Sequence, residues 1–405
     1  MKIAFFLLFS ISLVFANPLQ KVIDNAPPYS TLKLSPGIYK GSIVISKPLT
    51  IEGKDNGVII DAQNLGSVVT ILSSDVHLKK LILKNSGSQM HTIDAAISMQ
   101  NVQNCTIEKC SLLNSLYGID MAMVRDSNIS NNYISSKEFN LPLRGDALKM
   151  YYAHNNIISD NTIERSRDVT LNYSHHNLFT NNTFLHNRFA THLSLSNNNI
   201  FQKNIYKYNS VSIMIMGAKN TNITHNKLLS ANGAAGIALM IKGVKNFICK
   251  YNKISFNAKA LYIDGQEKAK GMKRFIEHND ISYNKEALHF HASIKDNTIA
   301  YNRFYANIDD IVKDIGGNFS PTNIVEYNYW DKYVGFDRDN NNIGDTPHKV
   351  YQYADQLWHY NNKVKFFYAS PTMTLLNFLS NLAPFVEPNL IMQDSKPVFT
   401  YSGEQ

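Results

Sequence analysis

Cysteine is scarce in this sequence, and the three cysteines present, Cys105, Cys110 and Cys249, form no CxxC pair. An odd and sparse set of this kind excludes a disulfide framework, so we expect all three thiols to be structural. Beyond residue 16 the sequence also lacks an apolar run long enough to cross a membrane. The second absence predicts that the mature chain is soluble.

The first 16 residues predict where the chain is sent. Lys2 precedes the apolar run IAFFLLFSISLVF, and Val14, Phe15 and Ala16 form a cleavage signal of the small-x-small type. We expect residues 1–16 to be a secretory signal peptide, with a retained anchor as the alternative. Removing Lys2 takes the 40 basic residues to 39 against 32 acidic ones, which leaves a formal charge of +7. This excess suits an acidic protein surface, a polyanion or a lipid face, and we expect no nucleic-acid partner.

Asparagine is abundant, and one asparagine recurs at intervals of 21 to 29 residues. An apolar residue stands two positions after each of these anchors, as in NNYI, DNTI, NNTF and HNKL. Cys110 with Leu112, and Leu81 with Leu83, continue the same series toward the N-terminus. The anchors are Asn132, Asn161, Asn182, Asn204, Asn226, Asn252, Asn279, Asn302 and Asn328.

A period near 22 residues, made of short alternating strands with Asn- and Ser-rich corners, is typical of a parallel β-helix. Each coil buries its apolar side only by stacking on the next coil. Asparagine suits a corner because it tolerates the left-handed conformation and can bond the same amide one coil away. We therefore predict an all-β fold, a right-handed parallel β-helix of the pectin-lyase type over residues 17–328. We also predict a short capping helix in PLQKVIDNA and an irregular or helical tail over residues 329–405.

Three coils and two tail segments carry a family resemblance. The coils are GDALKMYYAHNN, RDVTLNYSHHN and AAGIALMIKGVKN, and the tail segments are NYWDKYVGFDRDNNNIGDTPHKVY and FFYASPTMTLLNFLSNLAPFVEPNLIMQDSKPVF. They resemble the NosD family, the exported β-helix component of the nitrous oxide reductase maturation machinery. The first tail segment resembles that family's Asn-Tyr-Trp, Asp-x-Asp and Ile-Gly-Asp-x-Pro block. It departs from the family at Asn340, Asn341 and Asn342, where the acidic loop usually carries glycine.

The resemblance covers nearly the whole mature chain and implies a function by association. Proteins of this family are periplasmic and sit on a membrane-embedded ABC transporter, NosF with NosY. They receive copper from the lipoprotein chaperone NosL and help to load the copper sites of nitrous oxide reductase. The resemblance therefore implies a non-catalytic protein that handles copper and is associated with the inner membrane through its transporter partner.

Side chains on one outer face of the coils are candidates for transient copper binding. Counting back from the anchors, and then aligning the apolar alternation, places imidazole and thioether groups in neighbouring outward columns, with Asp264 also exposed. These soft and borderline ligands suit Cu(I), and partly exposed ligands suit a chain that passes its metal on. The alternative is that the methionines form a contact surface for a partner. The candidate copper ligands are His192, Met214, Met216, Met240, His289 and His291, all expected to be exposed.

Two further sets of residues receive a structural interpretation. His154 and His175 each lie seven positions before an anchor, so they are expected to be turn residues that stack at a corner. Met121 and Met123 alternate with Asp120 and with Ala122, so we expect both methionines to fill the core.

The acidic loop DRDNNNIGD offers oxygen ligands at alternating positions, close to a calcium-loop pattern. Its candidate ligands are Asp337, Asp339, Asn341 and Asp345. Glycine is missing where such loops turn sharply, although Asn342 can adopt the required positive φ, and no closing glutamate follows. Calcium binding and a plain Asx-turn loop both remain open, and either interpretation makes this loop structural.

The stretch SPTMTLLNFLSNLAPF predicts a helix over about residues 371–383, with Ser370 as its N-cap and Pro371 in its first turn. Apolar residues recur in it at every third position: Met373, Leu376, Leu379 and Leu382. One interpretation is a helix that caps the last coil, and the other is an element that docks on the membrane partner.

The main rival function is that of an extracellular polysaccharide lyase or hydrolase, because many β-helices have such activities. Glycoside hydrolysis needs two carboxylates at a set separation, and lyases need clustered acids and a basic residue. The coils are poor in acids, and the predicted outer face pairs Asp120 with Lys149 and Asp264 with Tyr262. We therefore expect no enzyme, and a purely structural docking scaffold stays as a third possibility.

Overall fold

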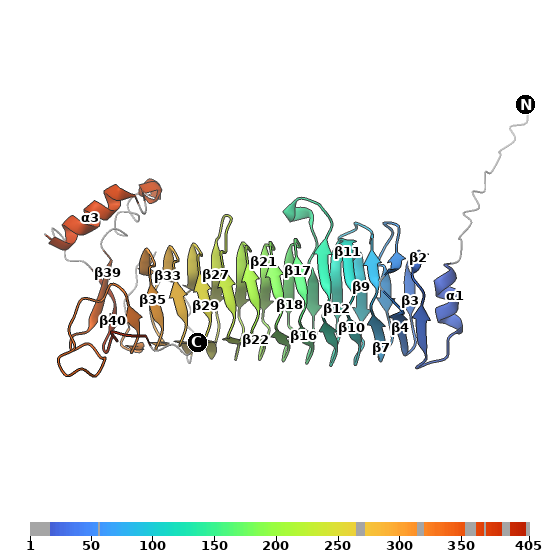
Figure 1. Cartoon of the computed structure of the whole chain (residues 1–405), viewed down its shortest axis with the longest axis horizontal. Helices are drawn as coiled ribbons and strands as arrows, with labels where there is room; N and C mark the ends of the chain where they lie inside the picture. Colours follow the sequence, from blue (N-terminus) through green and yellow to red (C-terminus); the bar gives the residue numbers. More distant parts are fainter. Residues whose placement is uncertain are drawn as a thin grey trace, which may run out of the picture.

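The computed structural model of the chain describes residues 17–55, 57–264, 272–313, 320–352, 362–367, 370–382 and 389–401. The expected signal peptide, residues 1–16, lies outside the described residues. Figure 1 shows an elongated solenoid in which short strands stack along the long axis. The chain is all-β and winds as a parallel β-helix, so the predicted fold class is confirmed.

Three parallel sheets, here named A, B and C, run along the solenoid because each coil contributes one strand to each sheet. Sheet A consists of β1 (Thr31–Leu34), β4 (Leu49–Gly53), β7 (Val76–Lys79), β10 (Thr106–Glu108), β13 (Asn128–Ser130), β16 (Ile157–Ser159), β19 (Leu178–Thr180), β22 (Ile200–Gln202), β25 (Asn222–Thr224), β28 (Phe247–Lys250), β31 (Arg274–Glu277), β34 (Asn297–Ala300) and β37 (Ile324–Glu326).

Sheet B consists of β2 (Gly37–Lys40), β5 (Val58–Asp61), β8 (Ile82–Lys84), β11 (Ser111–Ser115), β14 (Tyr133–Ser136), β17 (Thr162–Glu164), β20 (Thr183–Leu185), β23 (Ile205–Lys207), β26 (Lys227–Leu229), β29 (Lys253–Ser255), β32 (Asp280–Ser282), β35 (Arg303–Tyr305) and β38 (Tyr329–Trp330). Sheet C consists of β3 (Ile43–Ile45), β6 (Val69–Ile71), β9 (Ala95–Gln100), β12 (Tyr117–Ala122), β15 (Leu148–Tyr151), β18 (Asp168–Asn172), β21 (Phe189–Ser194), β24 (Val211–Met216), β27 (Ile237–Lys242), β30 (Lys259–Asp264), β33 (Glu286–His291) and β36 (Asp309–Lys313).

The anchor asparagines form a buried hydrogen-bonded ladder at the corner between sheets A and B. Asn182 donates its Nδ2–H to Oδ1 of Asn204 at 3.0 Å, and its own Oδ1 accepts from Nδ2 of Asn161 at 3.0 Å. Its Nδ2 also donates to the backbone carbonyl of Ile158 at 2.8 Å. Each amide thus satisfies buried polar groups of the preceding coil and of the next, as the repeat predicts.

Buried asparagines also line the other two corners, which the spacing of the anchors did not reveal. Asn156 donates to Oδ1 of Asn177 at 3.1 Å at the corner between sheets C and A. Asn257 donates to Oδ1 of Asn284 at 2.9 Å at the corner between sheets B and C. All three corners of the coil are therefore held by amide ladders, which fixes the stacking register of the coils.

The interior is filled by aliphatic and aromatic side chains that stack in register from coil to coil. Phe179 stacks on Phe201 with ring centroids 4.8 Å apart, and Phe184 stacks on Tyr206 at 4.6 Å. Because each ring covers the ring below it, the core is continuous along the solenoid.

The three cysteines are free thiols buried in this interior. Burial raises the pKa of the Cys110 and Cys249 thiols to about 12 and also raises the pKa of Cys105. A thiol that stays protonated is a poor nucleophile and a poor metal ligand. The structural role expected for these residues fits their surroundings.

One core prediction is wrong. Met121 is fully buried, whereas Met123 is 51% exposed. Met123 follows the end of β12 at a corner and adopts a left-handed φ of 57°, which breaks the alternation of the strand and turns its side chain outward. Alternation predicts burial only as far as the strand extends.

Different elements close the two ends of the solenoid. At the N-terminal end the predicted capping helix is present as α1 (Pro18–Asn25), whose N-cap Asn17 accepts from the backbone N–H of Leu19 at 3.0 Å. Its Leu19 and Ile23 are buried in the core of the solenoid. The apolar end of the first coil is thereby covered.

The C-terminal end is closed by the tail. The last coil extends past residue 328 through β38, and β39 (His348–Gln352) pairs with β40 (Asn389–Asp394) as an antiparallel two-stranded sheet. Helix α3 (Pro371–Leu382) lies beyond the last coils in Figure 1. Two short 3₁₀ helices, η1 (Leu141–Leu143) and η2 (Asn362–Phe367), complete the described elements.

Candidate metal-binding face

The outer side of sheet C brings imidazole and thioether groups into one column, as the sequence predicts. His192 in β21 lies directly opposite Met214 in β24, and Met214 lies opposite Met240 in β27. Neighbouring strands of a sheet lie about 4.8 Å apart. Met216 stands two residues after Met214, in the adjacent column. We call His192, Met214, Met216 and Met240 the methionine face.

Burial in β24 alternates along the strand. Ile213 and Ile215 are fully buried, whereas Met214 and Met216 are half-buried at the outer surface. Met240 in β27 follows the same pattern. Three thioethers thus lie at the surface of two neighbouring coils, where a metal ion or a partner protein can reach them.

His192 has the protonation state and the hydrogen-bonding state that a metal ligand needs. Burial lowers the pKa of His192, an effect opposed by the nearby Asp168 carboxylate and reinforced by Arg188. Its Nε2 is buried and has no hydrogen-bond partner. A neutral imidazole with an unpartnered ring nitrogen beside a thioether is a natural ligand for a soft metal ion.

The other two candidate histidines lie elsewhere on sheet C. Tyr262 occupies the column between Met240 and His289, so His289 is two coils away from the nearest thioether of that column. His291 lies opposite Asp264 in the adjacent outward column, the one that also contains Met216. The structure thus separates His289 and His291 from the methionine face.

The predicted exposure of His289 and Asp264 is wrong, because each is only 5% exposed. Tyr262 stacks on the His289 ring at 4.9 Å, and the His289 Nδ1 lies 2.5 Å from a Glu286 carboxylate oxygen. Lys259 contacts the same nitrogen at 3.1 Å. Asp264 is covered because it forms an ion pair with Lys242 at 3.1 Å. Outward-pointing side chains are buried here by their neighbours.

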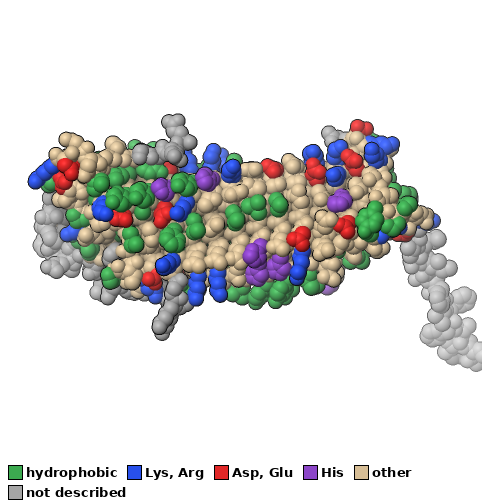
Figure 2. Space-filling model, turned by 90° about the horizontal axis from the view of Figure 1, so that it is seen from below, with side chains coloured by type: hydrophobic (Ala, Val, Ile, Leu, Met, Phe, Trp, Pro, Cys, Tyr) green, Lys and Arg blue, Asp and Glu red, His purple; other side chains and the backbone are tan. Residues whose placement is uncertain are grey.

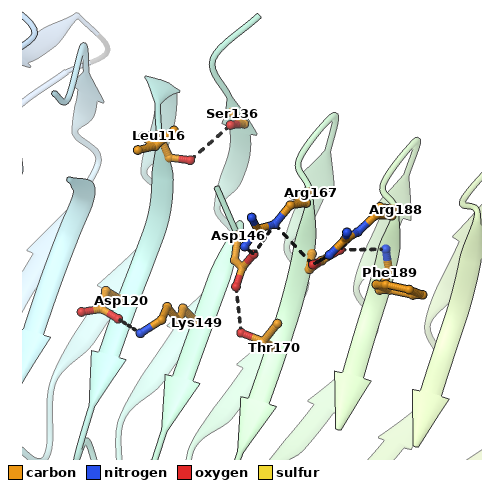
Figure 3. A network of polar contacts seen from close by, with 10 residues as sticks. Leu116, Asp120, Ser136, Asp146, Lys149, Arg167, Thr170, Arg188 and Phe189 are labelled. Atoms are coloured by element: carbon orange, nitrogen blue, oxygen red, sulfur yellow. Dashed lines mark hydrogen bonds and ion pairs between the residues drawn. The ribbon is translucent and has the colours of Figure 1, made fainter. Parts of the chain in front are cut away.

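The N-terminal half of the same outer face carries a network of ion pairs (Figure 3). Asp146 accepts from Arg167 at 2.8 Å and from the Thr170 hydroxyl at 3.0 Å. Arg167 also lies 3.4 Å from Asp168, which Arg188 binds in turn. Burial raises the pKa of Asp146, against the effect of Arg167.

The predicted pair of Asp120 with Lys149 belongs to this half of the face and is present at 3.5 Å. The pattern of the sequence did not predict the larger network, although its members stand one coil, or about 21 residues, apart. Each of the three buried carboxylates in it, Asp120, Asp146 and Asp168, is bound by a cation. These three carboxylates are therefore engaged in contacts within the face.

The corner histidines behave as turn residues. His154 stacks on His175 with ring centroids 5.0 Å apart, as predicted. The Nδ1 of His154 accepts from the backbone N–H of His175, and the Nδ1 of His175 accepts from that of Asn197. Burial lowers the pKa of both histidines, so each neutral ring carries its proton on Nε2 and offers no free lone pair to a metal.

The acidic loop is held by Asx-type contacts. Asp337 accepts from the backbone N–H of Asn341 at 3.1 Å and of Asn342 at 2.8 Å, and Asp345 accepts from that of Arg338 at 2.9 Å. Asn342 adopts a φ of 68°, the positive value that glycine usually supplies in such a loop. Among the described residues no three His, Cys, Asp or Glu side chains converge on a point that would hold a metal ion. Calcium binding by Asp337, Asp339, Asn341 and Asp345 stays a prediction.

The predicted C-terminal helix is present as α3, and the Ser370 hydroxyl accepts from the backbone N–H of Met373 at 3.3 Å. Met373 is buried, whereas Leu379 is 47% exposed. Leu375 and Phe378, which the three-residue spacing did not select, are each 56% exposed. The side chains of Leu376 and Leu382 lie outside the described part of the chain. Of the four residues predicted to form the docking contact, the two whose side chains are described differ in exposure: Met373 is buried and Leu379 is exposed.

Comparison with known proteins agrees with this architecture. Residues 130–335, more than half of the chain, match the family described as periplasmic copper-binding protein (NosD). A probable ABC transporter binding protein NosD from Pseudomonas aeruginosa is 23% identical over 424 residues, which cover 97% of this chain and 93% of that protein. The protein of the same description from Stutzerimonas stutzeri is 23% identical over 387 residues, 92% of this chain and 87% of its own length.

Solved structures with the same fold include enzymes that act on polysaccharides. A family 6 polysaccharide lyase specific for mannuronic acid, from human gut microbiota, has a TM-score of 0.53 at 13% identity and covers 90% of this chain and 96% of its own. The A-module of the mannuronan C-5 epimerase AlgE6 from Azotobacter vinelandii has a TM-score of 0.51 at 12% identity, with 76% and 93% covered. At this level of identity the likeness concerns the fold alone.

No helix in the described ranges is long and apolar enough to cross a membrane. The family that residues 130–335 match is described as periplasmic. On the strength of that match, the chain belongs to the NosD family of periplasmic copper-binding proteins.

Proposed function

We propose that this chain is a non-catalytic periplasmic protein that holds Cu(I) transiently on its methionine face and assists the assembly of copper centres in nitrous oxide reductase. Copper is its cargo rather than a resident cofactor. The observation that carries the proposal is the column His192, Met214 and Met240, in which a neutral imidazole with an unpartnered nitrogen is followed by two thioethers on successive coils.

The chemistry of this column supports Cu(I) over harder ions. Thioether and imidazole are soft and borderline ligands, whereas calcium and magnesium prefer oxygen. Methionine side chains are unbranched, so sulfurs on strands about 4.8 Å apart can turn toward one ion. Because the methionines are half-buried rather than enclosed, a partner can take the ion from them.

The other parts of the proposal rest on the relatives and on the tail. The names of the two relatives support an ABC transporter as the docking partner, which we identify with NosF and NosY. The family resemblance adds NosL as the copper donor and the inner membrane as the site of assembly. The exposed side of α3, with Leu375, Phe378 and Leu379, is a candidate for the docking contact.

The alternative role of the methionines is a contact surface that binds no metal. A Cu(I) competition titration with a chromophoric chelator separates the two roles. We expect Met214→Leu with Met240→Leu to weaken Cu(I) binding about ten-fold or more, because leucine keeps the apolar contact and removes the sulfur. Met123→Leu is the matched control, since Met123 is also exposed but lies away from the face. Equal affinities in all three proteins would leave only the contact role.

A second experiment tests the role in assembly. Deletion of the gene is expected to leave a nitrous oxide reductase that is made but poor in copper, as measured by metal analysis of the purified enzyme. Restoring the wild-type chain, but not the Met214→Leu with Met240→Leu variant, is expected to restore its copper content. A fully loaded reductase after the deletion would overturn the proposal.

A further inference from the structure

Charges are distributed very unevenly along this chain. Residues 169–263 contain ten lysine and arginine residues and no aspartate or glutamate. Elsewhere cations on one coil bind acids on a neighbouring coil, as Lys84 does with Asp61 at 3.6 Å and Lys149 with Asp120 at 3.5 Å. The acid-free segment, which spans the coils from β18 to β30, departs from this arrangement.

Some cations of the segment still reach acids at or beyond its borders. Arg188 binds Asp168, Lys242 binds Asp264, Lys250 binds Glu277 and Lys259 binds Glu286. The other six make no ion pair with any described residue, and all are exposed or half-exposed: Lys203, Lys207, Lys219, Lys227, Lys245 and Lys253. None of these six charges is neutralised by an acidic side chain in the described part of the chain.

Four of these lysines stand opposite one another on neighbouring coils. Lys227 in β26 is in register with Lys253 in β29, and Lys219 is in register with Lys245 at the corner between sheets C and A. Like charges directly opposite each other on neighbouring strands are destabilising. The fold does not require lysine there, because the same column holds Ile205 on the preceding coil. The lysine pairs therefore have no explanation within the folded chain.

The two pairs border one surface, which we call the basic face. It consists of the outer side of β22, β25 and β28, with Lys219 and Lys245 before these strands and Lys203, Lys227 and Lys253 after them. The first outward column across it is uncharged and holds Ile200, Asn222 and Ile248. The second holds Gln202, Thr224 and Lys250, and the charge of Lys250 is neutralised by Glu277. Figure 2 shows lysine and arginine side chains along the middle of one side of the molecule, close to a cluster of histidine side chains. An uncharged, partly apolar centre with a charged rim is the usual anatomy of a protein–protein interface.

We propose that the basic face binds an acidic surface of another protein. Its unpaired lysines complement carboxylates, and its uncharged centre suits direct contact. The aromatic rings at its border disfavour a polysaccharide, because Tyr251 is stacked between His225 and His278 at 5.1 and 4.9 Å and has neither face open to a sugar. The inference does not depend on copper binding, since none of these lysines belongs to the methionine face.

The test uses the purified chain and fluorescently labelled poly-L-glutamate as the acidic polypeptide, with fluorescence anisotropy as the measurement. We expect the wild type to bind this probe, with an affinity that falls as salt is added. Lys219→Glu with Lys227→Glu is expected to bind it about ten-fold more weakly or worse. The matched control, Lys21→Glu with Lys54→Glu, makes the same change in net charge at two exposed lysines near the N-terminal end that form no ion pair with a described residue, and is expected to bind like the wild type.

A stability measurement separates binding from structure. Each reversal places a glutamate opposite a remaining lysine, so the melting temperature of the basic-face variant is expected to be unchanged or higher than that of the wild type. A lower melting temperature together with weaker binding would show that these lysines are structural and overturn the proposal. Tighter binding to alginate oligomers or to phosphatidylglycerol vesicles than to poly-L-glutamate would also overturn it, as would equal weakening by the control variant.

Discussion

The Asp394 carboxylate accepts a hydrogen bond from the side-chain amide of Asn328 at 2.9 Å, in the place that the next asparagine of the ladder would occupy. The same oxygen accepts from the backbone N–H of Asn328 at 3.1 Å and from Nε1–H of Trp330 at 2.9 Å. Its other oxygen accepts from the backbone N–H of Lys396 at 3.0 Å. A fully buried residue 66 positions further along the chain thus terminates the ladder and joins the tail to the last coil.

The first prediction concerns this junction. Asp394→Ala leaves the buried donors of Asn328 and Trp330 without an acceptor, so we expect it to lower the free energy of unfolding by about 3 kcal/mol. Asp394→Asn keeps one acceptor oxygen and is expected to lose about half as much. Urea denaturation followed by circular dichroism measures both. A loss below about 0.5 kcal/mol for the alanine variant would mean that the tail does not stabilise the solenoid.

The second prediction tests the buried ladder against an exposed one. Asn204 donates to Oδ1 of Asn226 and to the carbonyl of Phe179, and its Oδ1 accepts from Asn182. Asn204→Ala leaves these groups unsatisfied in the interior, which we expect to cost about 3 kcal/mol of unfolding free energy, measured by urea denaturation.

The matched control for Asn204 is Asn220, which bonds to Asn198 at 2.8 Å and to Asn246 at 3.0 Å on the surface. Asn220→Gly preserves its positive φ of 53° and opens its neighbours to water, so a loss within about 0.5 kcal/mol is expected. Similar losses at the two positions would show that burial does not decide the strength of these ladders.

The sequence was sufficient to predict the coils and the column of His192 with Met214 because strand side chains alternate with a period of two. Once one asparagine per coil fixes the stacking, every outward residue acquires a defined neighbour. The exposure of His289 could not be predicted in this way, because Lys259, Glu286 and Tyr262 cover it from the side. Coverage depends on side-chain length and pairing, which a periodic pattern does not encode.

The end of the ladder could not be predicted either. Asp394 belongs to no repeat and lies 66 residues beyond Asn328, so no spacing points to it. The helix α3 was predicted from its N-cap and its apolar spacing, but which of its sides faces the protein depends on the tail contacts around it. These contacts occur once in the chain and leave no periodic signal.

The third prediction concerns that helix. Met373 is buried, so we expect Met373→Ala to cost about 2 kcal/mol of unfolding free energy. Leu375 and Phe378 are exposed, so Leu375→Ser with Phe378→Ser is expected to change the free energy by less than about 0.5 kcal/mol. If α3 docks on the transporter, only the second variant weakens association with membranes that contain the transporter while its stability is retained. Retained association in that variant would restrict α3 to capping the solenoid.

The fourth prediction is a pH dependence of copper binding. Burial lowers the pKa of His192 below its usual value of 6.5, so the neutral ring that can bind metal persists as the pH falls through 6.5. Cu(I) affinity of the wild type, measured by chelator competition and corrected for chelator protonation, is therefore expected to be constant from pH 8 to 6.5 and to fall only below that range. In His192→Gln no imidazole titrates on the methionine face, so the affinity is expected to be lower and to lose this dependence. Met214→Leu is the matched control, because it removes a sulfur ligand and leaves the titrating group in place. A wild-type affinity that already declines above pH 7, or a pH dependence that survives in His192→Gln, would show that His192 does not bind the metal.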